Sequence, residues 1–351
     1  MSESYLVDFL IKLVSIDTNS YERKNYDKIV NIIEEEAKKI GCNGERLVDS
    51  KGIPHLKITL PNAPTEAKKI VFLTHYDVVP AGEGWDFDPF SPFIKDGKVF
   101  GRGASDDKSG IAAAMAAFHE VMKERLELKV YPVLAAVGGE ETGESEEFLK
   151  SLDGDLCVVL DVVGCETLSI GASGAVVFTV IVKGKQAHSA YPFKGKNAIY
   201  EANRIVGFLE EKGREFEGTV TSRFPASLHY DRLPRRMHVT MIQGGVAQNV
   251  IPGECALKVN VRTIPEESAE KVAVEIKDML ESFAKENGIV LEVKLERVMD
   301  GWFTDKEEVI ERFKGILEDI VGKPVRVSVE LGGTDGRHFI CLLYTSPSPR
   351  D

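Results

Sequence analysis

Three short apolar runs in the first half of the chain are each followed by a histidine or by acidic residues. The runs, with the polar residues that follow them, are 70–73 with His75 and Asp77, 131–137 with Glu140 and Glu141, and 156–160 with Asp161. Apolar runs of this length are typical of strands buried on both faces of a sheet, and such a sheet gathers its ligands just beyond the carboxyl ends of its strands. The pattern therefore predicts a metal centre.

A fourth polar segment, residues 101–108, lies between the first two runs and precedes a helical pattern over residues 109–123. It lacks the third glycine of a dinucleotide fingerprint and the Gly-Lys-Ser/Thr of a P-loop, and it places Asp106 and Asp107 where a phosphate would sit. A cation therefore suits it better, although Asp107 and Lys108 can equally be first-turn helix residues. One histidine with acids at 77, 106, 140, 141 and 161 favours zinc, manganese or cobalt over a thiolate-bound metal.

Helical and strand patterns alternate from residue 5 to about residue 163, which predicts an α/β fold with a mainly parallel sheet flanked by helices. From residue 174 the order becomes strand, helix, strand, strand, helix, strand, as in a ferredoxin-like α+β domain. These six elements are expected at 175–182, 197–211, 238–242, 255–261, 267–285 and 289–295. We therefore expect a catalytic domain of residues 1–171 and 299–340, an inserted domain of residues 172–298, and an artefactual tail at 341–351.

Composition excludes several classes of function. The net charge of -12, with no block of Lys and Arg, argues against nucleic acid and anionic membrane as partners. No apolar run approaches the roughly 18 residues of a membrane span, and the N-terminus has the spacing of an amphipathic helix rather than of a signal peptide, so we expect a cytoplasmic protein. Five cysteines without a Cys-x-x-Cys spacing indicate neither a disulfide framework nor a thiolate zinc site.

Together, His75-x-Asp77, the segment from Gly101 to Asp106, the pair Glu140-Glu141 and Asp161 resemble the motifs of a known family of dizinc amidohydrolases. Its members are aminoacylases, acetylornithine deacetylases, succinyl-diaminopimelate desuccinylases, glutamate carboxypeptidases and dipeptidases. The resemblance, which includes the inserted domain, extends to about Phe339. It implies two zinc ions, with cobalt or manganese as possible substitutes.

The resemblance also implies the roles of the first-domain residues. His75 and Asp161 hold one zinc, Glu141 holds the other, and Asp106 bridges both. Glu140 is the implied general base, which takes a proton from the attacking water and returns it to the leaving amine. Asp77 lies on the same strand face as His75 and is expected to orient its imidazole. The peptide bond between Asp106 and Asp107 is expected to be cis.

In the inserted domain, His188 matches a family histidine that reaches the active site of the partner subunit and helps to hold the oxyanion. Asn249 and Arg262 fall where the family binds the substrate carboxylate, and a guanidinium fork suits a carboxylate. Gly333 and Thr334, in the loop Gly-Gly-Thr-Asp, are further candidates for substrate binding. These matches imply a homodimer formed through the inserted domain.

The implied reaction is hydrolysis of an amide bond in an N-acyl amino acid, as in a deacetylase or desuccinylase, or in a small peptide. A dipeptidase or carboxypeptidase of the same family is the alternative. In the family, the last metal ligand is a histidine well beyond the Gly-Gly-Thr-Asp loop, whereas His338 belongs to that loop. An inactive, metal-poor, dimeric binding protein is therefore the alternative from another class.

Overall fold

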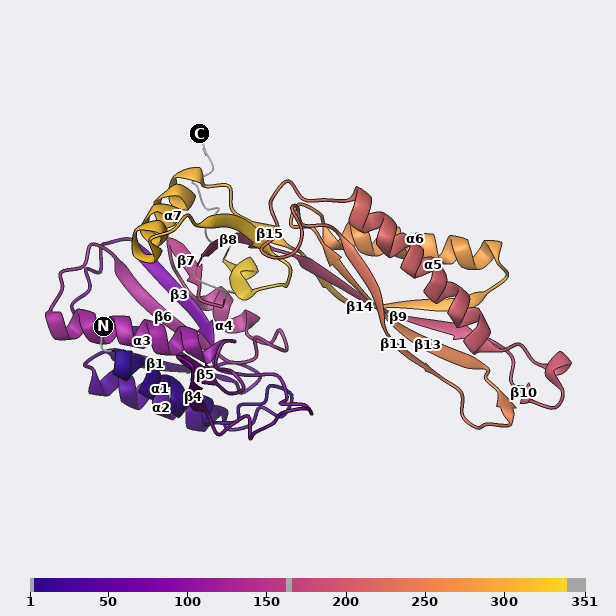
Figure 1. The fold of residues 1–351 in the computed structure, drawn as a ribbon, viewed down its shortest axis with the longest axis horizontal. Coiled ribbons are helices and arrows are strands. Elements are labelled where there is room, and N and C mark those ends of the chain that lie inside the picture. The colour runs from indigo at the N-terminus through magenta and orange to yellow at the C-terminus, as the bar shows by residue number, and fades with distance from the viewer. Residues whose placement is uncertain (1–2, 162–165, 340–351) are drawn as a thin grey trace. The chain divides into compact units, whose positions relative to one another are not determined.

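The computed structural model describes residues 3–161 and 166–339, and the expected tail at 341–351 lies outside them. The contacts divide the chain into two compact units, residues 1–163 with those from 338 onward, and residues 164–337 (Figure 1). Residues 299–337 thus group with the second unit, whereas the sequence places 299–340 with the catalytic domain. The domain boundaries drawn from the sequence stay a prediction.

The first unit is built around a five-stranded sheet in the order β1-β2-β6-β3-β7. Its elements are α1 Glu3–Val14, α2 Tyr26–Lys39, β1 Asn43–Val48, β2 Pro54–Thr59, β3 Lys69–His75, β4 Phe93–Lys95, β5 Lys98–Phe100, α3 Lys108–Glu124, β6 Tyr131–Val137, α4 Glu146–Ser151 and β7 Leu156–Val159. Strand β3 pairs in parallel with both β6 and β7, whereas β1 and β2 join the sheet in antiparallel fashion. The sheet is therefore mixed, and its parallel part contains the three predicted strands.

Two apolar layers cover this sheet. On one face, the buried side chains of α1, α2 and α3 pack on residues such as Leu56 and Leu134. On the other face, Phe148 and Leu149 of α4 pack on Val71 and Val133. Neighbouring residues of the central strands thus face opposite layers, which explains their continuous apolar sequence. The predicted α/β class, with helices on both faces of the sheet, is confirmed.

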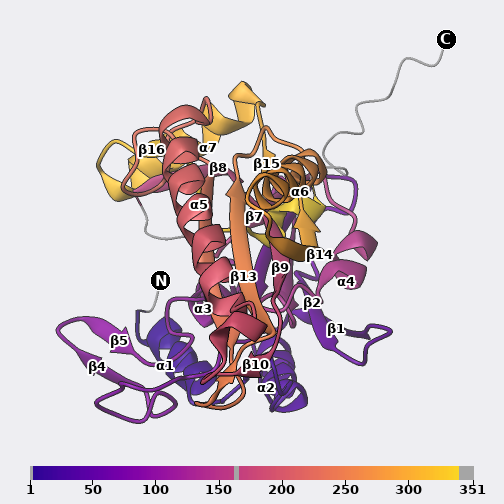
Figure 2. The same cartoon turned by 90° about the vertical axis from the view of Figure 1, so that its right-hand side faces the viewer.

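The second unit contains the predicted ferredoxin-like arrangement. Its elements are β8 Thr167–Ala172, β9 Gly174–Lys183, β10 Ala187–His188, η1 Pro192–Lys194, α5 Ala198–Thr219, β11 Arg236–Gly244, β12 Val250–Ile251, β13 Glu254–Thr263, α6 Ala269–Glu286, β14 Val290–Met299, β15 Trp302–Phe303, α7 Glu307–Val321 and β16 Arg326–Glu330, with η2 at Asp335–His338. The four long strands form an antiparallel sheet in the order β11-β13-β9-β14. Both α5 and α6 pack on one face of it (Figures 1 and 2).

Alternation along β13 shows why this sheet has one covered face. From Cys255 to Thr263, every second residue is buried, and the residues between them are partly exposed. The buried set, including Leu257 and Val259, lies in the apolar cluster with α5 and α6. The alternate set, including Arg262, lies on the face without helices. A three-stranded sheet, β15-β8-β16, completes this unit.

In the described part of the chain, no helix is long and apolar enough to cross a membrane.

Candidate metal centre

Three of the predicted ligands converge at the carboxyl edge of the first sheet. His75 ends β3, Asp106 precedes α3, and Asp161 follows β7. One ligand atom of each lies within 4.8 Å of the others. The Nε2 atom of His75 is 3.0 Å from Oδ1 of Asp106 and 3.9 Å from Oδ2 of Asp161. Because β3 and β7 are adjacent and parallel, their carboxyl ends meet at the same edge.

The chemistry of these three residues fits a bound metal ion. His75 is 2% exposed, and its buried Nε2 atom makes no regular hydrogen bond to a described residue. Burial alone would lower the pKa of His75, but the nearby carboxylates of Asp106 and Asp77 raise it well above its ordinary value. Imidazole nitrogen and carboxylate oxygen are the ligands that zinc accepts in metalloenzymes. A cation at this point would satisfy the nitrogen and offset the charge of the carboxylates.

Asp77 joins the end of β3 to the glutamate pair. Its carboxylate accepts hydrogen bonds from the backbone N–H groups of Glu140 and Glu141, at 3.3 and 3.2 Å. The Nδ1 atom of His75 is 3.0 Å from the backbone carbonyl oxygen of Asp77 and 3.6 Å from its carboxylate. Asp77 is fully buried. The Nδ1 atom of His75 is thus closer to the main chain of Asp77 than to its carboxylate, and that carboxylate holds the turn with the glutamates.

Glu141 lies close enough to the converged residues to respond to their charge. Burial, followed by the negative charge of Asp106, raises the pKa of Glu141 to about 7. Its Oε1 atom also accepts a hydrogen bond of 3.2 Å from the backbone N–H of Val79. The three-residue cluster itself contains neither Glu141 nor Glu140. The separate roles of the two glutamates therefore remain predictions.

Asp107 and Lys108 lie at the start of α3, but they are not ordinary exposed first-turn residues. Both are fully buried. The Asp107 carboxylate accepts hydrogen bonds from Thr74 Oγ1 at 2.6 Å and from the backbone N–H of His75 at 3.3 Å. The Lys108 ammonium donates a hydrogen bond of 2.6 Å to the carbonyl oxygen of Ile16. Asp107 thereby ties the start of α3 to the end of β3.

Local sequence features allow this close approach between α3 and β3. The peptide bond between Asp106 and Asp107 is cis, as predicted. A Cβ atom at Gly110 would lie 2.8 Å from Thr74 Oγ1, so only glycine fits there without displacement. The apolar pattern of the strand gave no sign that Thr74 would bind Asp107. A threonine between the apolar run 70–73 and His75 is the signal that could have revealed it.

The candidates in the second unit fall into two groups at opposite ends of the long sheet. At one end, His188 pairs with Val250 between β10 and β12, and Ser189 donates a backbone hydrogen bond of 2.9 Å to the carbonyl of Asn249. At the other end, Arg262 is opposite Ala175. Strand β13 has 10 residues, so the two ends are roughly 30 Å apart. His188 and Asn249 are neighbours, and Arg262 is remote from both.

Gly333 and Thr334 belong to the Arg262 end. A Cβ atom at Gly333 would lie 2.8 Å from the side chain of Met299, the residue of β14 that pairs with Ala175. The Thr334 hydroxyl accepts a hydrogen bond of 3.1 Å from the indole N–H of Trp302. Three candidates for substrate binding are therefore near one another, and the fourth, Asn249, is elsewhere.

Comparisons with known proteins agree with this architecture. Residues 170–288 match the model of a peptidase dimerisation domain. The chain is 30% identical over 318 residues to a succinyl-diaminopimelate desuccinylase of Aromatoleum aromaticum. The match covers 85% of this chain and 77% of that protein.

Solved structures share the fold at lower identity. An M20 family metallo-carboxypeptidase of Sulfolobus solfataricus has a TM-score of 0.76 at 20% identity, covering 98% of this chain and 89% of that one. The dipeptidase Dug1p of Saccharomyces cerevisiae has a TM-score of 0.77 at 18% identity, covering 97% of this chain and 87% of that one.

Proposed function

The chain belongs to the M20 family of metal-dependent amide hydrolases, and we propose that it cleaves the amide bond of an N-acyl amino acid or of a small peptide. The observation that supports this most strongly is the convergence of His75, Asp106 and Asp161 at one sheet edge. When bound there, zinc would polarise the substrate carbonyl and lower the pKa of water, and cobalt or manganese could substitute for it.

The ligands divide between two metal positions in this proposal. His75 and Asp161 would hold the first ion, Glu141 would contribute to the second, and Asp106 would contribute to both. The raised pKa of Glu141 supports its placement, because a carboxylate next to Asp106 is stabilised by a cation between them. Asp107 and Thr74 fix the start of α3 and the end of β3, and so hold Asp106 against His75.

Glu140 acts as the general base and acid. It accepts a proton from the attacking water and then donates that proton to the leaving amine. Asp77 positions it, because the Asp77 carboxylate accepts the backbone N–H of Glu140 as well as that of Glu141. Adjacent residues can take different roles when their shared backbone is held in this way and their side chains diverge.

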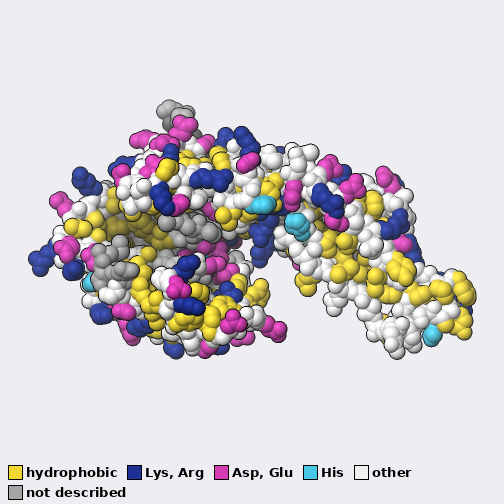
Figure 3. All heavy atoms as spheres, viewed as in Figure 1, with side chains coloured by type: hydrophobic (Ala, Val, Ile, Leu, Met, Phe, Trp, Pro, Cys, Tyr) yellow, Lys and Arg dark blue, Asp and Glu magenta, His cyan; other side chains and the backbone are white. Residues whose placement is uncertain are grey.

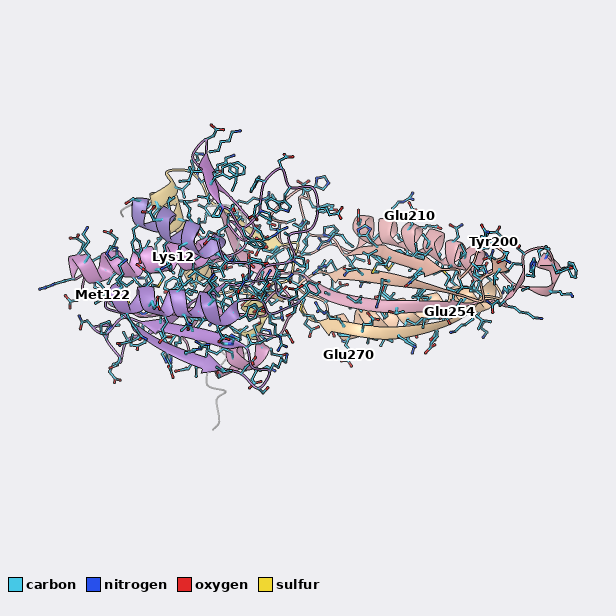
Figure 4. The ribbon with its side chains drawn as sticks, turned by 90° about the horizontal axis from the view of Figure 1, so that it is seen from below. Lys12, Met122, Tyr200, Glu210, Glu254 and Glu270 are labelled. Atoms are coloured by element: carbon cyan, nitrogen blue, oxygen red, sulfur yellow. The ribbon has the colours of Figure 1, made fainter. Side chains whose placement is uncertain are left out.

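We further propose that two copies of the chain assemble through the second unit. Strand β11 is an edge strand, and on it Met241 is 62% and Ile242 57% exposed. Tyr200, on the outer side of the adjacent α5, is 71% exposed (Figure 4). Figure 3 shows hydrophobic side chains gathered over this part of the unit. An unpaired strand with exposed apolar neighbours is a suitable surface for a second chain.

The separation of the candidate residues gives a second argument for a dimer. Substrate bound by Arg262, Gly333 and Thr334 would not reach His188 or Asn249 of the same unit, which lie at the other end of β13. In the proposed dimer, His188 and Asn249 of one chain serve the site of the other. His188 then stabilises the oxyanion of the tetrahedral intermediate.

A cytoplasmic location is also part of the proposal. The described cysteines, Cys42, Cys157 and Cys255, are all free. Free thiols are typical of reducing compartments.

The test is metal-dependent turnover on a panel of N-acetyl amino acids, N-succinyl amino acids and dipeptides. Removing metal with a chelator should abolish hydrolysis, and adding zinc should restore it. Chelator-resistant hydrolysis, or no hydrolysis of any panel member at any metal loading, would contradict the proposal.

A further inference from the structure

Two arginines lie directly opposite each other on the helix-free face of the long sheet. Arg236 of β11 pairs with Arg262 of β13. Their neighbours Met237 and Val261 lie in the apolar cluster under α5 and α6, so both arginines face the other way. Like charges in directly opposite positions of an antiparallel pair destabilise a sheet. The position therefore needs a compensating interaction.

Arg236 is held in place by neutral groups. It is 9% exposed, and its guanidinium donates hydrogen bonds to the hydroxyl of Ser173 at 2.8 Å and to the carbonyl oxygens of Leu331 and Pro234 at 3.0 and 3.3 Å. These contacts use Nε and Nη2. The third nitrogen, Nη1, makes no hydrogen bond to any residue that the structure describes.

Arg262 has even fewer contacts. It is partly exposed, and its guanidinium makes no hydrogen bond within the described ranges 3–161 and 166–339. Across the same residues, no carboxylate lies within 4.0 Å of either guanidinium. Glu217 is an acid that acts on Arg236 at longer range, and it lies 3.9 Å from His238 Nε2.

The electrostatic surroundings agree with this geometry. Burial, with the nearby charge of Arg262, lowers the pKa of Arg236. Burial and the charge of Arg297 likewise lower the pKa of Arg262. The chain has 56 acidic residues and a net charge of -12, so a buried arginine opposite a partly buried one, with no carboxylate beside either, is unusual for it. Buried charges are normally paired, and the partner here is missing from the described residues.

We propose that Arg236 is a specificity-determining residue which, with Arg262, binds a ligand that carries two carboxylates. This inference rests on the proposed function, in which Arg262 reads one substrate carboxylate, and it adds a second acidic group to the substrate. One carboxylate would accept two hydrogen bonds from the guanidinium of Arg262, and the other would accept a hydrogen bond from Nη1 of Arg236. A single carboxylate would leave one of the two facing charges without compensation.

The substrate class that follows is an N-acyl derivative, or a small peptide, of a dicarboxylic amino acid. Ser173 and the Leu331 carbonyl pre-orient Arg236, so its side chain pays little rotational entropy when the ligand binds. A substrate with an apolar side chain in that position would leave the Nη1 donor desolvated and unpaired. The pair therefore selects for the acidic group and against its apolar isostere.

The test compares glutarate with pentanoate, which have the same number of carbon atoms and differ by one carboxylate. Calorimetric titration of the full chain should show glutarate binding about tenfold or more tightly, because a hydrogen-bonded charge pair is gained. Arg236→Gln should abolish most of this ratio and leave pentanoate binding within about twofold of the wild type. Arg214→Gln, which changes an exposed arginine of α5 that pairs with Glu210, is the control and should keep the ratio.

Equal affinity of the wild type for the two acids would overturn the inference, and so would an unchanged ratio in Arg236→Gln. If Arg236→Gln fails to fold, Arg262→Gln decides, because the Arg262 guanidinium makes no hydrogen bond to the described residues. Glutarate must then bind Arg262→Gln no more tightly than pentanoate binds the wild type. The measurement involves no turnover, so a failure of the metal-centre proposal would leave its result interpretable.

The same ratio should appear in kinetics. The KM of N-acetylnorvaline should exceed that of N-acetylglutamate by a similar factor in the wild type, and the two should converge in Arg236→Gln with kcat little changed. A loss of kcat for both substrates without a change in their KM ratio would indicate a structural role and contradict the proposal.

Discussion

The first unit brings its candidate residues together, whereas the second unit keeps its candidate residues apart. In the first unit, residues separated by up to 86 positions meet within 4.8 Å, because each ends a strand, follows one or precedes a helix at the same edge of a parallel arrangement. In the second unit, Asn249 and Arg262 are only 13 positions apart in sequence, yet Asn249 lies beyond the start of β13 and Arg262 lies near its far end. Parallel strands gather distant residues, whereas a long antiparallel strand separates close ones.

This difference teaches how each unit can take part in catalysis. The first unit contains a self-contained group of candidate ligands. The second unit has one group near β10 and another near the Gly174 end of β9, and a single substrate cannot span both. A complete site that uses both groups therefore requires two chains, and the predictions that follow test this contrast.

The largest effect is expected from Glu140→Ala. Loss of a general base should lower kcat by about 10²- to 10⁴-fold. Bound zinc should be nearly unchanged, because Glu140 is not one of the proposed ligands. Activity assays with parallel metal analysis measure both quantities, and Glu140→Gln serves as the isosteric control. Zinc loss as large as that of Asp106→Ala would show that Glu140 is a ligand.

The next prediction tests whether the second unit acts across the dimer. Neither His188→Ala nor Glu140→Ala should be active alone, but mixing them after dissociation should restore activity. Random pairing places one intact site in half of the dimers, so about a quarter of the wild-type activity should return. Recovery should be absent if His188 serves its own chain. Mixing Glu140→Ala with Asp106→Ala, whose defects lie in the same site, is the matched negative control.

A smaller effect is expected from Arg262→Lys. Lysine keeps the charge but not the planar fork, so substrate binding should weaken by about tenfold while kcat changes little. Steady-state kinetics separate the two constants. A fall in kcat without a change in KM would place Arg262 outside the binding of substrate.

The smallest effect concerns pH and the metal-free protein. Burial raises the pKa values of both Glu141 and Asp107 to about 7. Between about pH 4 and pH 7, the folded protein then binds more protons at these groups than the unfolded chain does. Their contribution to stability therefore falls as pH rises through this window. The Tm of metal-free Glu141→Gln should decline less steeply between pH 5 and pH 8 than that of the metal-free wild type. An equal or steeper decline would contradict the raised pKa of Glu141.

Much of the first unit was predictable because its signals are local. The apolar runs before His75, Glu140 and Asp161 identify buried strands, and the polar residues at their ends identify an edge where ligands gather. The burial of Asp107 and Lys108 was not predictable in the same way. Their partners, Thr74 and Ile16, are distant in sequence, and first-turn helix positions are usually exposed.

In the second unit, the order of elements predicted the ferredoxin-like sheet. The positions of Asn249 and Arg262 were not predictable in the same way, because both match family residues that bind the substrate carboxylate, which suggested that they lie close together. Only the length of the strand between these two residues indicates how far apart they lie. Nothing in the sequence indicated a binding role for Arg236, since an arginine at the start of a strand is common. Its meaning depends on the cross-strand register, which places it opposite Arg262.

The most direct test of the account is a zinc titration of the wild type and of three single variants, His75→Ala, Asp106→Ala and Asp161→Ala. Asp88→Asn, which alters an exposed turn carboxylate hydrogen-bonded to Phe90 and Ser91, is the control. Each ligand variant should bind zinc at least about tenfold more weakly, with Asp106→Ala the most affected, and Asp88→Asn should match the wild type. Zinc binding that is unchanged in all three ligand variants would contradict the proposed metal centre.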